Sequence, residues 1–198
     1  MRTHGFWVLI LVLAAVWAAP ASAATARETV ERQVGLILEQ LRDPAFKGLD
    51  RDAQVRRIRE IINQVFDYTE LSKRSLGKDW KAFDPGQQKE FTALFGSLLE
   101  KTYADRVLAY TSERIDFGGE TELREGQVEV ASVIVTADNR QIPLNYRAIL
   151  QDGAWRVYDV VIEGISLVQN YRSQFREIMA KQSPSELISF LRDKTKND

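Results

Sequence analysis

The sequence predicts an α+β fold in which a curved antiparallel sheet of about four strands packs against several helices. Apolar residues recur at helical spacing over about 26–110, β-branched residues and turn signals replace them over about 113–163, and helical spacing returns over about 165–195. Consecutive strands with short turns indicate an antiparallel meander. We expect amphipathic helices to cover one face of this sheet, forming a cone. Periodicity leaves open whether side chains fill the space between sheet and helices or leave an apolar cavity.

The N-terminal half is expected to be helical. One apolar face at 3.6-residue spacing runs over Val30–Leu41, and a second runs over Val55–Val65. A capping box at Asp67 predicts a short helix that ends near Gly77. The strongest helix-start signal is Asp84-Pro85-Gly86-Gln87, which has an N-cap residue, a Pro at the first helical position and a Gln at the third. It opens the longest helix, which covers 84–110.

The central part of the chain has strand patterns. We expect a short strand that ends before a turn at Gly118-Gly119, and a hairpin turn at Asp152-Gly153 between the last two strands. The expected strands cover 113–117, 127–136, 142–151 and 155–162. Two helices follow, one over Val168–Ile178 and one that begins at a capping box at Ser183.

The N-terminus has the pattern of a cleaved secretory signal. A cationic start precedes an apolar run from Phe6 to Ala19 and a small-residue cleavage site at Ala21-Ser22-Ala23. The apolar run is shorter than the ~20 residues that span a bilayer. We therefore expect residues 1–23 to be removed and residues 24–198 to form one secreted domain. A retained membrane anchor is the alternative, although no Cys follows the site for lipidation.

The missing residue types argue against catalysis. The chain has no Cys, and its one His is His4, inside the expected signal. The mature chain therefore lacks the commonest general base, the commonest metal ligand and the thiol nucleophile. We expect no enzyme activity, no cofactor and no metal. The 27 basic residues are balanced by 28 acidic ones, so we also expect no nucleic-acid partner. No long exposed apolar seam is evident, which favours a monomer.

The segment after the last strand is the most specific part of the sequence. It reads Gly164-Ile165-Ser166-Leu167-Val168-Gln169-Asn170-Tyr171-Arg172. Two further features precede it: Phe66-Asp67-Tyr68 before the short helix, and Trp80 before the longest helix. In this order, and over nearly the whole mature chain, they resemble the toluene-tolerance family, which contains the MlaC-type periplasmic phospholipid-binding proteins.

The resemblance implies a carrier in the periplasm. Its cargo would be a diacyl phospholipid, with the acyl chains in a cavity between sheet and helices and the headgroup near solvent. Its partners would be an outer-membrane lipoprotein–porin complex and an inner-membrane ABC lipid transporter. A branch of the family is associated with hopanoid synthesis, so a polycyclic triterpenoid cargo is an alternative. A structural interaction module with a filled core and an enzyme with carboxylates or Tyr in its pocket are two others.

The resemblance also suggests which residues contact lipid. On the longest helix we expect Phe91, Phe95, Leu98, Leu99 and Tyr103, on the strands Val133, Val135, Leu144, Tyr146, Val157 and Val160, and on the following helix Val168. Spacing alone favours core packing for the helix face. Alternation along the strands does not show which face of the sheet lines the cavity.

Arg172 is the most specific polar candidate for a functional role. A guanidinium matches phosphate, so Arg172 could contact a lipid headgroup or a docking partner. The simpler interpretation is that it pairs with Asp159 or Glu163 and holds the junction between the last strand and the next helix. These two carboxylates could also be taken for a glycosidase-like pair, but nothing else supports that interpretation. The charged cluster over Arg51–Glu60 is most simply a solvated helix face, with a docking surface as the alternative.

Overall fold

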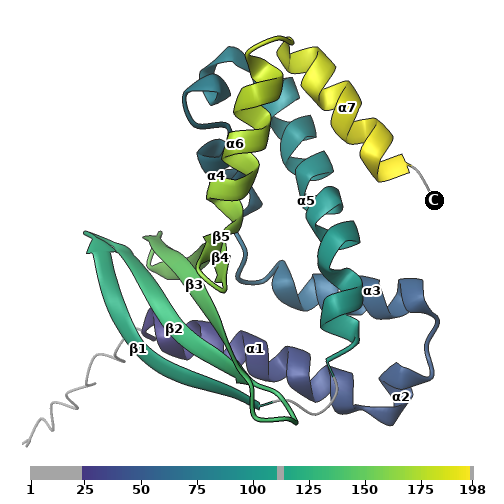
Figure 1. Cartoon of the computed structure of the whole chain (residues 1–198), viewed down its shortest axis with the longest axis vertical. Helices are drawn as coiled ribbons and strands as arrows, with labels where there is room; N and C mark the ends of the chain where they lie inside the picture. The colour runs from purple at the N-terminus through teal and green to yellow at the C-terminus, as the bar shows by residue number, and fades with distance from the viewer. Residues whose placement is uncertain (1–23, 111–113, 197–198) are drawn as a thin grey trace, which may run out of the picture.

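The computed structural model describes residues 24–110 and 114–196 (Figure 1). The expected signal, residues 1–23, lies outside the described residues. The elements follow in the order α1 (Ala26–Arg42), α2 (Pro44–Lys47), α3 (Arg51–Ile62), α4 (Tyr68–Leu76), the 3-10 helix η1 (Gly77–Ala82), α5 (Pro85–Leu108), β1 (Arg114–Arg124), β2 (Gln127–Val135), β3 (Gln141–Gln151), β4 (Ala154–Ile162), β5 (Ile165–Ser166), α6 (Leu167–Met179) and α7 (Pro184–Lys196). The predicted α+β class and the predicted order of helices, sheet and helices are confirmed.

The sheet is an antiparallel meander in the order β1-β2-β3-β4-β5. It has one strand more than expected because the chain turns back after β4 and pairs Ile165 with Ile162. Gly164, with φ 81°, lies in this turn, a backbone region that glycine enters without steric cost. The short β5 leads directly into α6, so the turn sets where that helix begins.

The first strand differs from the prediction. Gly118 and Gly119 lie inside β1, which runs on to Arg124, so the predicted turn at these two glycines is wrong. The pairing of β1 with β2 shifts between Phe117 and Glu120, as at a β-bulge. A Cβ atom added at Gly118 would lie 3.3 Å from the Cβ of Ala131 on β2. Here glycine permits a close approach of two strands instead of reversing the chain.

Helix α5 begins where the sequence predicts. The Asp84 carboxylate accepts a hydrogen bond from the Gln87 amide at 2.9 Å, and the Gln87 side chain accepts one from the Asp84 amide at 3.1 Å. Pro85 occupies the first helical position, where its missing N–H is not needed. From this cap α5 extends for 24 residues and is the longest helix of the described chain.

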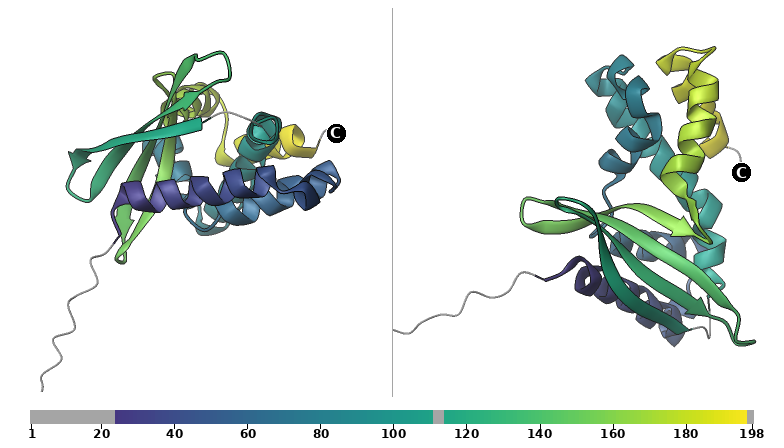
Figure 2. Two further views of the ribbon diagram at one scale, coloured as in Figure 1. Left: turned by 90° about the horizontal axis from the view of Figure 1, so that it is seen from below. Right: turned by 60° about the vertical axis from the view of Figure 1, so that its left-hand side comes forward.

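The helices form two groups connected by α5. Figure 1 shows α4, α6 and α7 around the first half of α5, while α1 lies beside the sheet, α3 lies beside the second half of α5, and α2 connects α1 to α3. The views in Figure 2 show α1 lying across one face of the sheet, in agreement with its contacts to β1, β2 and β4.

The buried apolar residues form separate clusters. The largest is aromatic, lies among α4, α5, α6 and α7, and includes Phe91, Phe95 and Phe175. A second cluster joins α1 to the sheet through Val30, Val130, Val157 and their neighbours. A third joins the end of α1 to α2 and α3. Between the second and third clusters the packing is incomplete.

Candidate functional site

A cavity of about 410 Å³ lies between the sheet and helices α1, α3 and α5. This volume falls within the range of small-molecule binding sites, about 300–1,000 Å³. Apolar side chains make up most of its wall: Val30, Val34, Ile37, Leu38 and Leu41 of α1, Val55, Ile58 and Ile62 of α3, Leu99, Tyr103, Ala104, Val107 and Leu108 of α5, and Ile115, Ile134, Leu144, Tyr146, Val157, Val160 and Ile162 of the sheet. The space between sheet and helices is therefore a cavity and not a filled core.

Six of the twelve residues expected to contact lipid line this cavity. They are Leu99 and Tyr103 on α5, Leu144 and Tyr146 on β3, and Val157 and Val160 on β4. Leu144, Tyr146 and Val160 face the same side because the register places Tyr146 opposite Val160 and Leu144 opposite Ile162, and a register shift after Arg147 pairs Val157 with Ala148 and so brings Val157 to that side too. The structure thus brings together helix and strand residues that lie up to about 60 positions apart in the sequence.

Phe91, Phe95, Leu98 and Val168 do not line the cavity. Their expected position is corrected, because all four belong to the aromatic cluster among α4 to α7 or pack against it. The Phe95 ring lies 4.8 Å from that of Tyr171 and 5.1 Å from that of Phe175, centroid to centroid. One continuous apolar face of α5 therefore serves two purposes: its first half packs in the core, and its second half reaches the cavity.

Val133 and Val135 are corrected for a different reason. Ile134 lies between them on β2 and lines the cavity, whereas neither valine does. Successive side chains of a strand point to opposite faces of the sheet. Val133 and Val135 therefore belong to the face away from the cavity. The strand was predicted correctly, and the structure decides the face, which the sequence left open.

The sequence indicated the apolar faces of α1 and α3 but did not connect them with lipid contact. Both helices contribute to the wall, through residues such as Val34, Ile37 and Ile62. The signal was the 3.6-residue spacing itself, which predicts a buried face and does not say what the face is buried against.

Polar groups at the wall are few and mostly neutral or paired. Arg59 of α3 forms an ion pair with Glu100 of α5. Burial, with a smaller contribution from the charge of Glu100, raises the pKa of Tyr68 to about 12. Burial also raises the pKa of Tyr146. Both phenols are therefore uncharged at neutral pH.

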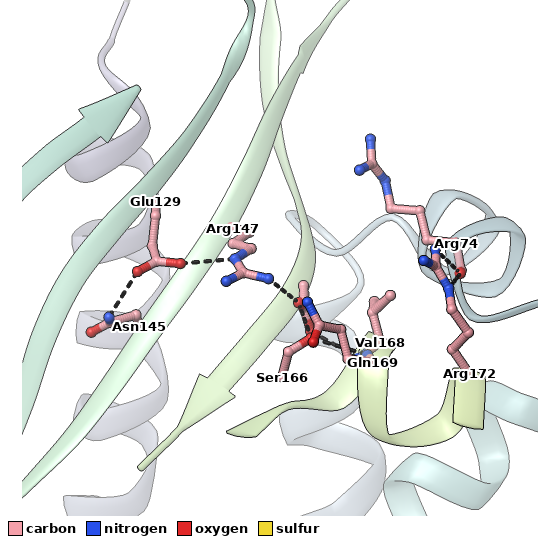
Figure 3. A network of polar contacts seen from close by, with 9 residues as sticks. Arg74, Glu129, Asn145, Arg147, Ser166, Val168, Gln169 and Arg172 are labelled. Atoms are coloured by element: carbon pink, nitrogen blue, oxygen red, sulfur yellow. Dashed lines mark hydrogen bonds and ion pairs between the residues drawn. The ribbon is translucent and has the colours of Figure 1, made fainter. Parts of the chain in front are cut away.

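A polar network lies on the face of the sheet away from the cavity (Figure 3). The Asp159 carboxylate, 1 % exposed, accepts hydrogen bonds from the Ser166 hydroxyl at 2.6 Å and the Val168 amide at 3.0 Å. Arg147 approaches the same carboxylate at 3.3 Å and donates to Glu129 at 2.8 Å. Burial raises the pKa of Asp159, while the hydrogen bonds and Arg147 lower it. The network joins β2, β3 and β4 to the first turn of α6.

Arg172 takes a position that the sequence did not predict. Its guanidinium donates two hydrogen bonds, of 2.8 and 2.5 Å, to the backbone carbonyl of Arg74 near the end of α4 (Figure 3). The predicted pairing with Asp159 or Glu163 is wrong, because Arg147 already occupies Asp159. Glu163 is exposed in the turn after β4, which also removes the geometry of a carboxylate pair. Arg172 does not line the cavity.

The described residues contain neither a metal-binding cluster nor a helix suited to cross a membrane. Among residues 24–110 and 114–196, no three His, Cys, Asp or Glu side chains are grouped so that they could hold a metal ion. Over the same ranges, no helix has both the length and the apolar content that a membrane crossing requires.

Comparison with known proteins decides the family. Residues 31–193 match the family described as MlaC protein. The chain belongs to the MlaC family. Among MlaC relatives, the intermembrane phospholipid transport system binding protein MlaC of Haemophilus influenzae is 25 % identical over 167 residues, which cover 78 % of each chain. The predicted resemblance is thereby confirmed.

A solved structure shares the fold of this MlaC-family chain. It is that of a phospholipid-binding protein from Ralstonia solanacearum in complex with a phospholipid. The two chains superpose with a TM-score of 0.79 and 25 % sequence identity, over 87 % of this chain and 97 % of the other. Nearly the whole neighbour, and not a fragment of it, thus corresponds to the chain described above.

Proposed function

We propose that this protein is a phospholipid-binding transport protein that holds acyl chains in the cavity between sheet and helices. The observation that carries the proposal is the cavity itself, about 410 Å³ with an almost wholly apolar wall. Membership of the MlaC family and the phospholipid complex of the Ralstonia neighbour support it. The lipid contacts would be the six predicted residues at the wall together with the apolar faces of α1 and α3.

The energetics of lipid transfer require such a wall. Burying a CH₂ group in an apolar environment releases ~0.8 kcal/mol, so two acyl chains resist transfer into water by roughly 20 kcal/mol or more. A carrier must therefore offer a site about as apolar as the bilayer. The transfer between membrane and protein is then nearly balanced, and a partner protein can shift it in either direction. This role requires no catalytic residue, so the proposal includes that the protein is not an enzyme.

We further propose the setting in which the carrier works. Residues 1–23 are a cleaved signal, the mature protein is periplasmic, and it moves lipid between an outer-membrane lipoprotein–porin complex and an inner-membrane ABC transporter. The pattern of residues 1–23 supports secretion. The name of the Haemophilus relative, an intermembrane phospholipid transport system binding protein, supports the transport role.

The test is lipid loading of two matched variants. Leu144 on β3 lines the cavity, whereas Val133 on β2 is half-buried on the opposite face. We expect Leu144→Arg to lose most bound lipid, because it places a charge among acyl chains, and Val133→Arg to keep it. Native mass spectrometry of protein purified from the periplasm without detergent measures the bound mass. Solvent extraction then identifies it.

Two controls make the result decisive. Circular dichroism shows whether each variant is folded. Leu144→Trp, which fills space without adding charge, should also reduce loading. If the wild-type protein carries no lipid, even after incubation with liposomes, or if Leu144→Arg is folded and fully loaded, the carrier proposal fails. A hopanoid in the extract would retain the carrier and change its cargo.

A further inference from the structure

The charged side chains at the cavity wall are the starting point. Among the described residues that line it, these are Arg59, Glu100 and Arg106. Arg59 and Glu100 form an ion pair and largely cancel one another. Asp105, the carboxylate next to Arg106 in sequence, pairs with Arg51 at 2.9 Å. Within the described part of the chain, Arg106 is therefore the cation of the wall that has no carboxylate partner.

The position of Arg106 on α5 places it where the cavity meets solvent. Leu99, Tyr103 and Arg106 follow one another on α5 at intervals of four and three residues, so they share one stripe of the helix surface. Leu99 is buried, Tyr103 is half-buried and Arg106 is exposed. The stripe thus passes from the apolar interior to the surface at Arg106. We call this point the cavity mouth.

The Arg106 guanidinium at the cavity mouth is oriented by an aromatic ring, and its N–H groups are available to a ligand. It lies over the Tyr103 ring, 5.7 Å from the centroid, a distance at which a cation is attracted to an aromatic face. Stacking on a ring engages the face of a guanidinium and leaves its N–H groups free to donate in their plane. Those N–H groups form a fork that matches the oxygens of a phosphate.

We propose that Arg106 binds the phosphate of the carried lipid at the cavity mouth and makes the carrier favour phosphate-bearing lipids over uncharged ones. This inference rests on the proposed function. Acyl chains in the cavity would place the attached phosphodiester at the surface, beside Arg106. A phosphate at Arg59 would have to displace Glu100 first, which is why the geometry points to Arg106. An uncharged polycyclic or diacyl lipid would leave this guanidinium without a partner.

The experiment compares two lipids with identical acyl chains. Delipidated full-length mature protein is incubated with vesicles that contain either phosphatidylethanolamine or diacylglycerol, and the lipid transferred to the protein is measured at equilibrium. For the wild-type protein we expect about tenfold tighter binding of phosphatidylethanolamine, which corresponds to ~1.4 kcal/mol. Arg106→Gln should remove this preference by weakening phosphatidylethanolamine alone, and Arg106→Lys should keep part of it because the charge remains without the fork.

Two comparisons separate a binding role from general effects. Arg56→Gln removes an exposed arginine of α3 that does not line the cavity and should keep the wild-type preference. For the unmodified protein, raising the salt concentration should reduce the preference, because an exposed ion pair is screened. The salt dependence is measured on the wild-type protein, so it tests the proposal even if a variant does not fold.

The outcomes distinguish the two proposals. Wild-type protein that takes up neither lipid overturns the proposed function and this inference with it. Wild-type protein that takes up both equally, a preference that does not respond to salt, or a folded Arg106→Gln variant with an unchanged preference overturns the role of Arg106 alone. Loss of the preference in Arg106→Gln but not in Arg56→Gln supports it.

Discussion

Asp159 shows how a single buried charge can hold two elements together. Among the described residues it is the carboxylate with almost no exposure, and each of its oxygens has a hydrogen-bond partner. Its partners belong to β3, β5 and α6, so one side chain joins the sheet to the helix that follows it. Removing one partner of a buried ion pair destabilises the folded protein mainly because the remaining groups stay buried and unpaired.

We expect Asp159→Ala to lower the free energy of unfolding by about 3 kcal/mol. The substitution leaves the Val168 amide and the Ser166 hydroxyl without their acceptor, and it leaves Arg147, 25 % exposed, with Glu129 alone. Urea unfolding followed by circular dichroism measures the change.

The matched control is Asp138→Ala. Asp138 also accepts from an arginine, Arg140 at 2.8 Å, but both side chains are exposed. Solvent competes for such a pair, so we expect almost no loss of stability. If the two substitutions have equal effects, the network behind the sheet does not hold α6 in the way described.

At the scale of the element, α5 combines two environments in one helix. Its first half, with Phe91 and Phe95, packs in the aromatic cluster, and its second half lines the cavity, with Leu99 and Tyr103 contacting both. The capping box that starts the helix lies at the end remote from the cavity. Stability and lipid binding are therefore separable along this helix.

Substitution of the cap should test that separation. Asp84→Ala removes the acceptor for the Gln87 amide, and we expect a loss of about 1 kcal/mol in the free energy of unfolding. Lipid loading, measured by native mass spectrometry, should not change. Asp84→Asn, which retains a good capping residue, should be close to the wild type in both measurements. A large drop in loading with Asp84→Ala would show that the two halves of α5 are coupled.

At the scale of the whole molecule, the two groups of helices should respond differently to lipid. Helices α1 and α3 line the cavity, while α7 packs only in the aromatic group through Leu187, Ile188 and Leu191. Cavity-lining helices lose packing partners when the lipid is removed, and local opening is easiest where buried apolar contacts are few.

Removal of lipid should therefore increase hydrogen exchange in α1 and α3 more than in α7. The loaded protein should also be more stable, by ~2.7 kcal/mol when free lipid is present at 100 times its dissociation constant. Hydrogen exchange with mass spectrometry, on loaded and delipidated protein, resolves the helices. Uniform change across all helices, or none in α1 and α3, would contradict the assignment of the wall.

The sequence alone determined the order and class of the elements and the family. Caps, Pro and Gly positions and apolar spacing are local signals, so the start of α5 at Asp84 and the strands at 127–135 and 141–151 could be predicted from neighbouring residues. The same local signals misread Gly118-Gly119, because a glycine that permits close strand approach looks like a glycine that permits a turn.

The tertiary structure decided what each apolar face is buried against. Period-two alternation is the same whichever face of a sheet lines a cavity, so only the packing of α1 across the sheet distinguishes Ile134 from Val133. Helical spacing likewise does not show where an apolar stripe passes from the core to the cavity, as the stripe of α5 does. The contact of Arg172 was decided in the same way, because its guanidinium binds the backbone carbonyl of Arg74, which lies 98 positions away in the sequence.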